Sequence, residues 1–174
     1  MIERASKGPR SDIEPFVRDF DQFYLENYRS VVALVYTLTG SRHGAEDIAQ
    51  DAFLRAHRQW REVSGYERQD GWVRVVAMNL ARSRLRRIGA ETRALGRVAG
   101  LTRTTFPELE PHNERFWQAV RDLPRRQREV VALHYLEDRP VADVAEILGV
   151  AESTIKNSLA QGRRTLARTL EVAL

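Results

Sequence analysis

Residues 71–88, GWVRVVAMNLARSRLRRI, decide how the rest of the sequence is interpreted. Trp72, Val76 and Leu80 recur at four-residue spacing, and valines and alanines between them widen the apolar side. This period is typical of an α-helix that buries one face, because each helical turn takes about 3.6 residues. The stretch therefore predicts a helix that packs against a core along its apolar side.

A second side of the same stretch is strongly basic. Asn79, Arg82 and Arg86 fall on it at helical spacing, and further arginines, Arg74 among them, flank these three. No acidic residue occurs between positions 70 and 91, whereas the exposed faces of helices usually mix both signs of charge. Two interpretations stay open at this point: an ordinary basic surface helix, or a helix whose arginines face the phosphates and bases of a nucleic acid.

The composition narrows the classes of protein to consider. Of the 174 residues 43% are hydrophobic, enough for a core, and the formal net charge of +4 favours anionic partners. The sequence has no cysteine, which excludes disulfides, thiolate metal sites and cysteine nucleophiles and suits a reducing cytoplasm. No run approaches the roughly 20 apolar residues of a membrane span, so we expect a cytoplasmic protein without membrane insertion. Candidate nucleophiles, bases and metal ligands do not coincide, so we predict no enzyme, catalytic residue, metal, cofactor or small-molecule substrate.

Helical periodicity runs through the first part of the chain, after a tail at 1–10 that we expect to be disordered. Aromatic and aliphatic residues from Phe16 to Val35 recur at three- and four-residue spacing, and they predict one long helix or two joined ones, ending at Gly40. A second amphipathic helix is predicted at 45–60, with acidic residues crowded in its first half. No period-2 stretch predicts a strand, so we expect an all-α protein.

Residues 89–112 have a different character. They contain several glycines and prolines and a Thr-rich stretch, and only 91–98 is compatible with a short helix. A connection of this length is rare within a compact domain. We therefore predict two small helical domains, at 11–88 and 113–174, joined by a long flexible linker.

The second domain ends in a pattern typical of a helix-turn-helix. Ala145, Gly149 and Ile155 have the spacing at which a small residue, a turn and an apolar residue let two helices cross closely. The second helix continues with an inward apolar stripe as far as Leu170 and presents short polar and basic residues on its other side. Such side chains near a helix N-terminus read base edges in the major groove, which favours DNA binding over a purely structural helix pair.

The order of these features resembles the sigma-70 superfamily, and most closely its small extracytoplasmic-function (ECF) branch. The resemblance covers nearly the whole chain after the tail, and its strength lies in the order and spacing of segments that are weak individually. The segments that carry it are Leu38-Thr39-Gly40, AEDIAQDAFLRA at 45–56, residues 72–80 with Arg86-Arg87, Leu123-Pro124, Arg128-Glu129-Val130, the helix-turn-helix, and Thr154-Ile155-Lys156.

The resemblance implies an alternative sigma factor, which binds core RNA polymerase, recognises a promoter and helps to open the duplex for transcription initiation. Its partners would be core RNA polymerase, promoter DNA and an anti-sigma factor. Core polymerase would be bound by Glu46, Asp47, Gln50, Asp51, Phe53 and Leu54. The minus-ten element would be bound by Tyr66, Trp72, Asn79, Arg82, Ser83, Arg86 and Arg87. The minus-thirty-five element would be bound by Ser153, Thr154, Lys156, Asn157, Gln161 and Arg164.

The resemblance also implies how the minus-ten element is held. The family melts the duplex and keeps flipped non-template bases in a pocket beside the loop before the minus-ten helix, here 62–69. Asn79 matches a family position at this site, and the arginines would hold the backbone of the opened strand. Tyr66 or Trp72 could stack on a base, although packing is the better interpretation of Trp72.

Four residues depart from the family pattern. The family often has an acid at the position of Ser83, and Arg at the positions of Ser158 and Gln161. Ala151 stands where a polar N-cap usually begins the recognition helix, a loss of about 1 kcal/mol if nothing compensates. The departures at Ala151, Ser158 and Gln161 leave open whether the contact with the minus-thirty-five element is a strong one, and the basic minus-ten helix stays in place.

Two other functions stay open from the residues alone. A stand-alone helix-turn-helix regulator would bind an operator without polymerase, but this needs a dimer, and no heptad pattern appears. A sigma mimic that sequesters an anti-sigma protein is expected to lose the basic face, which residues 82–87 retain.

Overall fold

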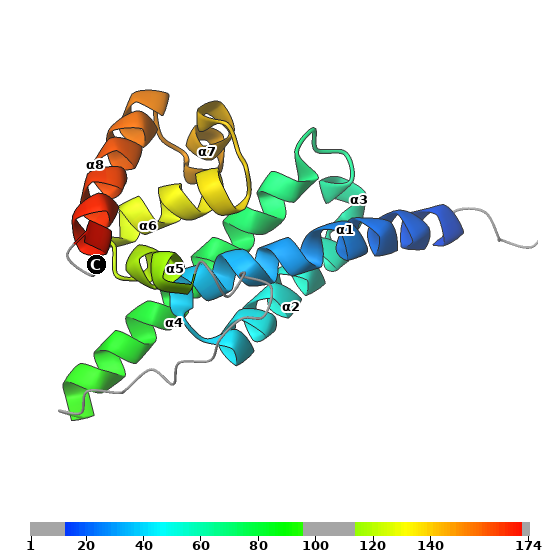
Figure 1. Ribbon diagram of the computed structural model, residues 1–174. Coiled ribbons are helices and arrows are strands. Elements are labelled where there is room, and N and C mark those ends of the chain that lie inside the picture. The colour runs from blue at the N-terminus through cyan, green and yellow to red at the C-terminus, as the bar shows by residue number, and fades with distance from the viewer. Residues whose placement is uncertain (1–12, 96–113, 172–174) are drawn as a thin grey trace, which may run out of the picture.

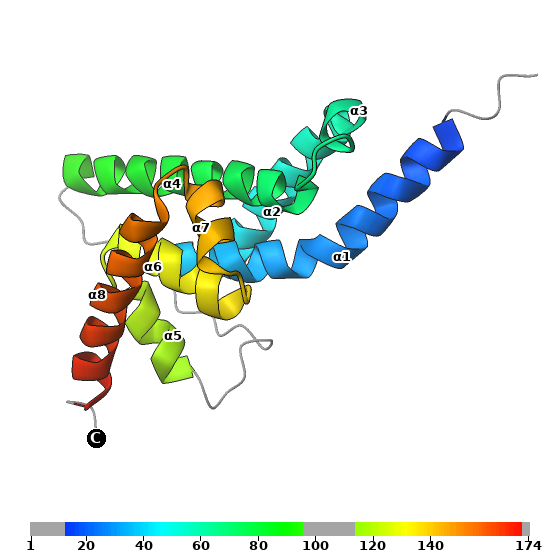
Figure 2. The same ribbon diagram turned by 90° about the horizontal axis from the view of Figure 1, so that it is seen from above.

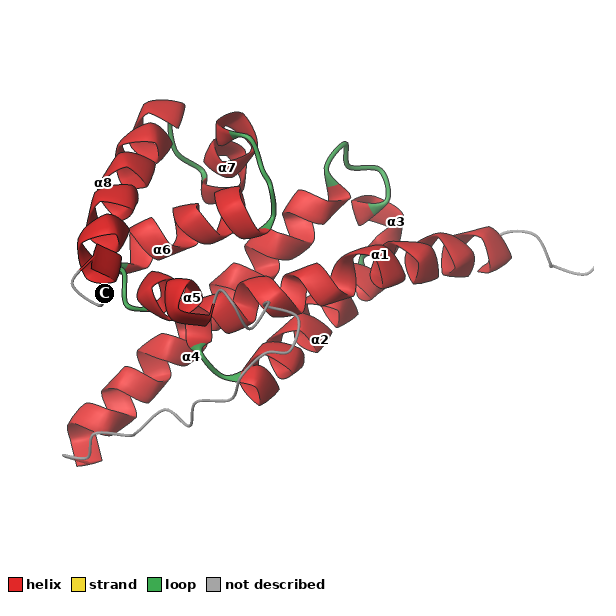
Figure 3. Ribbon diagram, in the orientation of Figure 1, coloured by secondary structure: helices red, strands yellow, loops and turns green. Residues whose placement is uncertain are grey.

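A computed structural model describes residues 13–95 and 114–171. Every regular element within these ranges is a helix and none is a strand, which confirms the all-α prediction (Figure 3). The predicted tail at 1–10 and the larger part of the predicted linker lie outside the described residues. The elements are α1 (Ile13–Thr39), α2 (Arg42–Arg58), α3 (Trp60–Val63), α4 (Gln69–Leu95), α5 (Glu114–Arg121), α6 (Arg125–Val131), the π-helical turn η2 (Ala132–Leu136), α7 (Val141–Leu148) and α8 (Glu152–Glu171).

The helices form two units that pack against each other. In the N-terminal unit, α1 to α4, the long helices α1, α2 and α4 contact one another, and the short α3 contacts both α1 and α2. In the C-terminal unit, α5 to α8, helix α8 packs on α5, α6 and α7. The C-terminal unit lies on the N-terminal one, with α7 against α4 and with α5, α6 and η2 against α1 (Figures 1 and 2).

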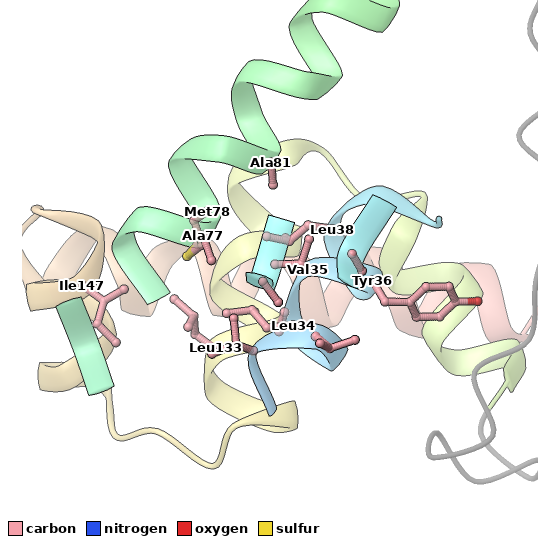
Figure 4. Close-up of a cluster of buried hydrophobic side chains, with 14 of the residues drawn as sticks. Leu34, Val35, Tyr36, Leu38, Ala77, Met78, Ala81, Leu133 and Ile147 are labelled. Carbon is pink, nitrogen blue, oxygen red and sulfur yellow. The ribbon is translucent and has the colours of Figure 1, made fainter. Parts of the chain in front are cut away.

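One hydrophobic core joins the two units (Figure 4). Leu34 of α1 and Leu133 of η2 are fully buried, and Met78 of α4 is 1% exposed. Ile147 of α7 lies in the same cluster. Burial of apolar surface stabilises a fold by about 25 cal/mol per Å². Separating the two units would therefore cost free energy unless another molecule buried the apolar side chains that become exposed.

Helix α4 buries its predicted apolar side, but the most deeply buried residues are those that widen this side and not its central line. The predicted strip of Trp72, Val76 and Leu80 is only partly buried, whereas Val73 and Ala77 are fully buried. The reason is that α4 has neighbours on two sides, α1 and α2 from its own unit and α7 from the C-terminal unit.

Both ends of α4 also differ from the prediction. The helix begins one residue before Asp70, so Asp70 lies in its first turn instead of capping it. It continues past residue 88, so residues 89–95 of the predicted linker are helical. Arg93 supports this extension, since its Nε donates to the carbonyl of Gly89 (3.0 Å).

Helix α2 begins at Arg42, earlier than the predicted residue 45, because Ser41 caps its N-terminus. The Ser41 hydroxyl accepts a hydrogen bond from the backbone N–H of Gly44 (3.2 Å), which satisfies one of the donors left free at a helix N-terminus. The other end also differs, because α2 stops at Arg58 and Trp60 begins the separate helix α3.

The helix-turn-helix is confirmed. Helix α7 ends at Gly149, whose φ of 63° is the left-handed conformation that glycine adopts without strain. Ala145 is 6% exposed and Ile155 is fully buried, so the small residue and the apolar residue lie at the crossing of α7 and α8 as the spacing predicts.

Gly162 lets α8 approach α6 closely. A Cβ on Gly162 would lie 3.0 Å from Val131 Cγ2, a buried atom, so we expect Gly162→Leu to lower the free energy of unfolding by about 1–3 kcal/mol through overpacking. The matched control is Gly89→Ala in α4, where no atom lies within 4 Å of the added Cβ. This change should raise stability by about 0.5–1 kcal/mol because alanine is the better helix former. Urea unfolding followed by circular dichroism measures both, and an unchanged Gly162→Leu midpoint would contradict the packing.

Candidate protein and nucleic-acid interfaces

An apolar groove of about 420 Å³ runs between α1 and α2. Leu54 lies on its rim and is 52% exposed, whereas Phe53 is 2% exposed and forms the floor. The aromatic rings of α1 pack on Phe53, with Tyr24 at 5.1 Å between ring centroids. The lining residues are Phe20, Tyr24, Gln50, Phe53, Leu54 and His57, and we name this surface the α1–α2 groove.

The predicted core-binding residues are thus only partly brought together. Gln50, Phe53 and Leu54 line the α1–α2 groove, but the acidic residues have other contacts. Glu46 accepts from Arg42 (3.1 Å) within α2, and Asp47 lies 3.5 Å from Arg84 of α4. Asp51 is exposed on α2 and does not line the groove. Phe53 is buried, so it shapes the groove more than it offers surface.

The basic side of α4 carries two hydrogen-bonded pairs of polar side chains. Asn79 accepts from Arg82 (3.0 Å), and Ser83 accepts from Arg86 (3.1 Å). Arg86 is exposed, and so is Arg87. We name Asn79, Arg82, Ser83, Arg86 and Arg87 the basic face.

Arg74 does not belong to the basic face, although the sequence pattern placed it among the flanking arginines. Its side chain is 5% exposed and forms an ion pair with Glu137 of the C-terminal unit. Its guanidinium also donates to Asn27 Oδ1 (3.2 Å) and Ser30 Oγ (2.9 Å) on α1. A buried guanidinium needs such partners, because an uncompensated charge in the interior is costly.

A hollow of about 440 Å³ lies beside Tyr66 and Trp72, between the loop after α3 and the start of α4. Tyr66 is 37% exposed, and its hydroxyl donates to Glu62 (2.5 Å), a hydrogen bond that raises the pKa of Tyr66 above its ordinary value. Trp72 is partly buried and packs against the core. Glu146 and Ile147 of α7 also line the hollow, so the C-terminal unit forms part of its wall.

Arg82 of the basic face is held by the C-terminal unit. Its Nε and Nη2 donate to the two carboxylate oxygens of Glu129, at 2.8 and 2.9 Å. Glu129 is 1% exposed. This bidentate geometry is the strong form of an arginine–carboxylate pair.

A second group of ion pairs joins the start of α4 to the segment around α7. Arg139 pairs with Asp70, and Arg68 pairs with Asp143. Burial by itself would raise the pKa of Asp70, but Arg139 and Arg74 outweigh it and lower that pKa below its ordinary value. The hydrogen bond from Arg68 lowers the pKa of Asp143 in the same direction.

Helix α8 presents its polar side outward. Lys156 lies 3.3 Å from Glu152 of the first turn, and Gln161 and Arg164 line a hollow of about 690 Å³ beside α6. Ser158 is only 9% exposed, so its departure from the family pattern lies on the inner side of α8. All the predicted minus-thirty-five residues are exposed: Ser153, Thr154, Lys156, Asn157, Gln161 and Arg164.

The sequence pattern did not predict several of the residues that form these surfaces. Phe20, Tyr24 and His57 line the α1–α2 groove, but the aromatic stripe predicted core, and a lone histidine carried no signal. The sequence pattern also did not predict the ion pair of Glu129. Its position directly before two apolar valines, which are buried in the structure, indicates that its carboxylate needs a charged partner.

Within residues 13–95 and 114–171, no helix is long and apolar enough to cross a membrane. No group of three or more His, Asp or Glu residues is placed there to hold a metal ion.

Comparison with known proteins identifies the family. The model of sigma-70 region 2 matches residues 23–91, and the model of sigma-70 region 4 matches residues 113–166. The ECF RNA polymerase sigma factor SigW of Bacillus subtilis is 27% identical over 98% of this chain and 97% of its own length. The ECF sigma factor SigM of Mycobacterium tuberculosis is 33% identical over 87% of this chain and 76% of its own length.

A solved structure agrees with these matches. The sigma factor RpoE from Bartonella quintana, in complex with the anti-sigma factor NepR, superposes with a TM-score of 0.79 at 25% identity. The match covers 89% of this chain and 98% of that one. The findings support neither the stand-alone regulator nor the sigma mimic. The chain therefore belongs to the sigma-70 family of RNA polymerase sigma factors, within its ECF branch.

Proposed function

We propose that this sigma factor directs core RNA polymerase to promoters through three surfaces. The α1–α2 groove binds core polymerase, and Leu54 is its central contact. The basic face of α4 holds the opened strand of the minus-ten element, with a flipped base in the hollow beside Tyr66 and Trp72. The outward side of α8 binds the minus-thirty-five element as duplex.

One observation carries this proposal. Helix α4 combines a buried apolar strip with a basic face that contains no carboxylate of its own between residues 70 and 91. A helix held this firmly, with arginines projecting from one side, is suited to a polyanion, because each arginine–phosphate contact also releases counterions. The apolar groove on α1 and α2 belongs to the same unit and offers a separate surface to a protein partner.

We further propose that the chain works in the cytoplasm without catalytic residues or a cofactor, and that an anti-sigma factor regulates it. The chemistry of initiation then belongs to the polymerase. The similar Bartonella sigma factor was solved with an anti-sigma factor bound, which supports the last point.

Run-off transcription tests the function. Purified chain and core RNA polymerase are incubated with a pool of promoter fragments from the source genome, and transcripts are sequenced. We expect specific transcripts that require the chain. The function is falsified if no fragment yields a chain-dependent transcript while a housekeeping sigma factor is active with the same core enzyme.

Arg86→Ala should weaken binding of the holoenzyme to all promoters alike. Arg86 is exposed, and the described residues place no carboxylate beside it, so its charge is available to a phosphate. Losing one phosphate contact should reduce the slope of log affinity against log salt by about 1. Fork-junction binding at several salt concentrations measures this slope. Arg93→Ala, on the same helix beyond the basic face, is the matched control and should leave the slope unchanged.

Asn79→Ala should instead change which bases are accepted. An exposed amide beside Arg82 can hydrogen-bond a base edge, and such a contact discriminates between bases by about 1–3 kcal/mol. Binding to templates randomised across the minus-ten element measures the preference. A uniform loss of affinity without a change of preference would assign Asn79 to backbone contact.

A further inference from the structure

The hollow beside Tyr66 is lined by a loop and by the beginning of a helix. The loop after α3 is closed by Gln69, whose Nε2 donates to the carbonyl oxygen of Ser64 (2.8 Å). Gly71, Trp72 and Val75 of α4 line the same hollow. The shape of the hollow therefore depends on where the first turns of α4 lie relative to the rest of the N-terminal unit.

Arg74 fastens this part of α4 to the middle of α1. Its Nη1 donates to the carbonyl oxygen of Asp70 (2.9 Å) and to Asn27 Oδ1 (3.2 Å). Its Nη2 donates to Ser30 Oγ (2.9 Å). Side chains of a helix point toward its N-terminus, so the guanidinium of Arg74 lies back over the first turn. One planar group thus joins two helices through three hydrogen bonds, all of them within the N-terminal unit.

The two acceptors on α1 are themselves held in place. Asn27 Nδ2 donates to the carbonyl oxygen of Phe23 (3.0 Å), and Ser30 Oγ donates to the carbonyl oxygen of Asn27 (2.9 Å). The side chain of Arg74 is 5% exposed, so solvent weakens these hydrogen bonds little. A buried fork with fixed partners holds the backbone around it in one geometry, which a preformed binding pocket requires.

The position of Arg74 excludes a direct contact with DNA in this structure. Arg86 of the same helix is exposed, whereas Arg74 is buried and does not line the hollow. Its ion pair with Glu137 uses Nε and leaves the three hydrogen bonds within the N-terminal unit in place. Arg74 is therefore placed to act on the hollow only through the backbone of α4.

We propose that Arg74 is a positioning residue for the flipped base of the minus-ten element. By fastening the first turns of α4 to Asn27 and Ser30, it keeps the hollow beside Tyr66 and Trp72 in the shape that accepts a base. The proposal rests on the function proposed above and adds a residue that determines the specificity of that site.

Abasic templates measure the contribution of the hollow in the holoenzyme. Fork-junction templates from a promoter found by run-off transcription carry either the base or an abasic sugar at each non-template position of the minus-ten element in turn. The ratio of the two affinities reports the base alone, because the sugar-phosphate backbone is the same. With the unchanged chain we expect a ratio of about tenfold at the flipped position, within the range of one stacked base. A ratio near one at every position would overturn the proposal.

Arg74→Lys should lower this ratio to about threefold or less. Lysine keeps a positive charge near Glu137, but a single ammonium cannot replace the planar fork that reaches Asn27, Ser30 and the carbonyl of Asp70. The salt dependence of binding should stay the same, since no phosphate contact is lost. Asn27→Ala combined with Ser30→Ala should lower the ratio equally. Adding Arg74→Lys to this pair should lower it no further, because all three changes remove one link.

Glu137→Gln is the matched control. It removes the ion pair of Arg74 but leaves the hydrogen bonds to α1, so the ratio should stay near tenfold. A general loss of stability would weaken binding to both templates alike and leave the ratio unchanged. A full ratio with Arg74→Lys, or an equal drop with Glu137→Gln, would overturn the proposal. A salt slope lower by about 1 with Arg74→Lys would overturn it as well, by making Arg74 a phosphate contact.

Transcription separates the positioning role from the function on which it rests. If the unchanged chain and the Arg74→Lys variant both drive run-off transcription and show the same ratio, the function stands and the positioning role is wrong. If no transcript depends on the chain, the proposed function itself fails, and the positioning role fails with it.

Discussion

Leu54→Asp should lower the affinity of the chain for core RNA polymerase by about 30-fold or more. Leu54 is 52% exposed on the rim of the α1–α2 groove, and an apolar side chain central to an interface commonly contributes about 2 kcal/mol or more. Aspartate would also bring an unpaired carboxylate into a surface that becomes dry on binding. Fluorescence anisotropy of the labelled chain titrated with core polymerase measures the affinity, and run-off transcription should fall in parallel.

Leu25→Asp is the matched control for this change. Leu25 is 74% exposed on α1 and does not line the groove, so the same substitution there should leave core binding within about twofold. Equal losses from both changes would show that added negative charge, and not the groove, is responsible. If the Leu54→Asp variant keeps full affinity for core polymerase, the core-binding surface lies elsewhere on the chain.

Trp60→Ala should destabilise the chain more than any other single change discussed above. Trp60 is 1% exposed, and its ring lies 5.2 Å from that of Phe20 and 5.0 Å from that of Phe23. Truncating a buried tryptophan costs about 3–5 kcal/mol, and for a chain of this size the melting temperature should fall by about 10 °C or more. Since Phe20 also lines the α1–α2 groove, core binding should weaken as well.

Trp60→Phe provides the comparison. The indole N–H of Trp60 is buried without a hydrogen-bond partner among the described residues, so removing it sacrifices no bond. We expect a loss below about 1.5 kcal/mol, because most of the aromatic contact is kept. Thermal unfolding of both variants followed by circular dichroism measures the difference. Similar stability of the two variants would mean that the aromatic cluster of α1 and α3 contributes little.

The sequence by itself determined the helices, the turn and the family. The helix-turn-helix could be predicted because Ala145, Gly149 and Ile155 act within a few residues of one another, where backbone geometry and side-chain size are sufficient. The apolar side of α4 was predictable for the same reason, since periodicity records which face a helix buries. Periodicity does not record how many neighbours cover that face, so the exact buried strip and the end of α4 differed from the prediction.

Only the tertiary structure decided which arginines face solvent. Arg74, Arg82 and Arg86 are equivalent in a sequence pattern, yet Arg74 is buried, Arg82 is bound by Glu129 and Arg86 is exposed. The partner of Arg82 lies 47 residues away along the chain, beyond the reach of any local rule. The α1–α2 groove likewise combines residues from two helices. Both features depend on how the packed helices are oriented in space, because charge pairing and surface shape are set by distances between segments and not by spacing along one of them.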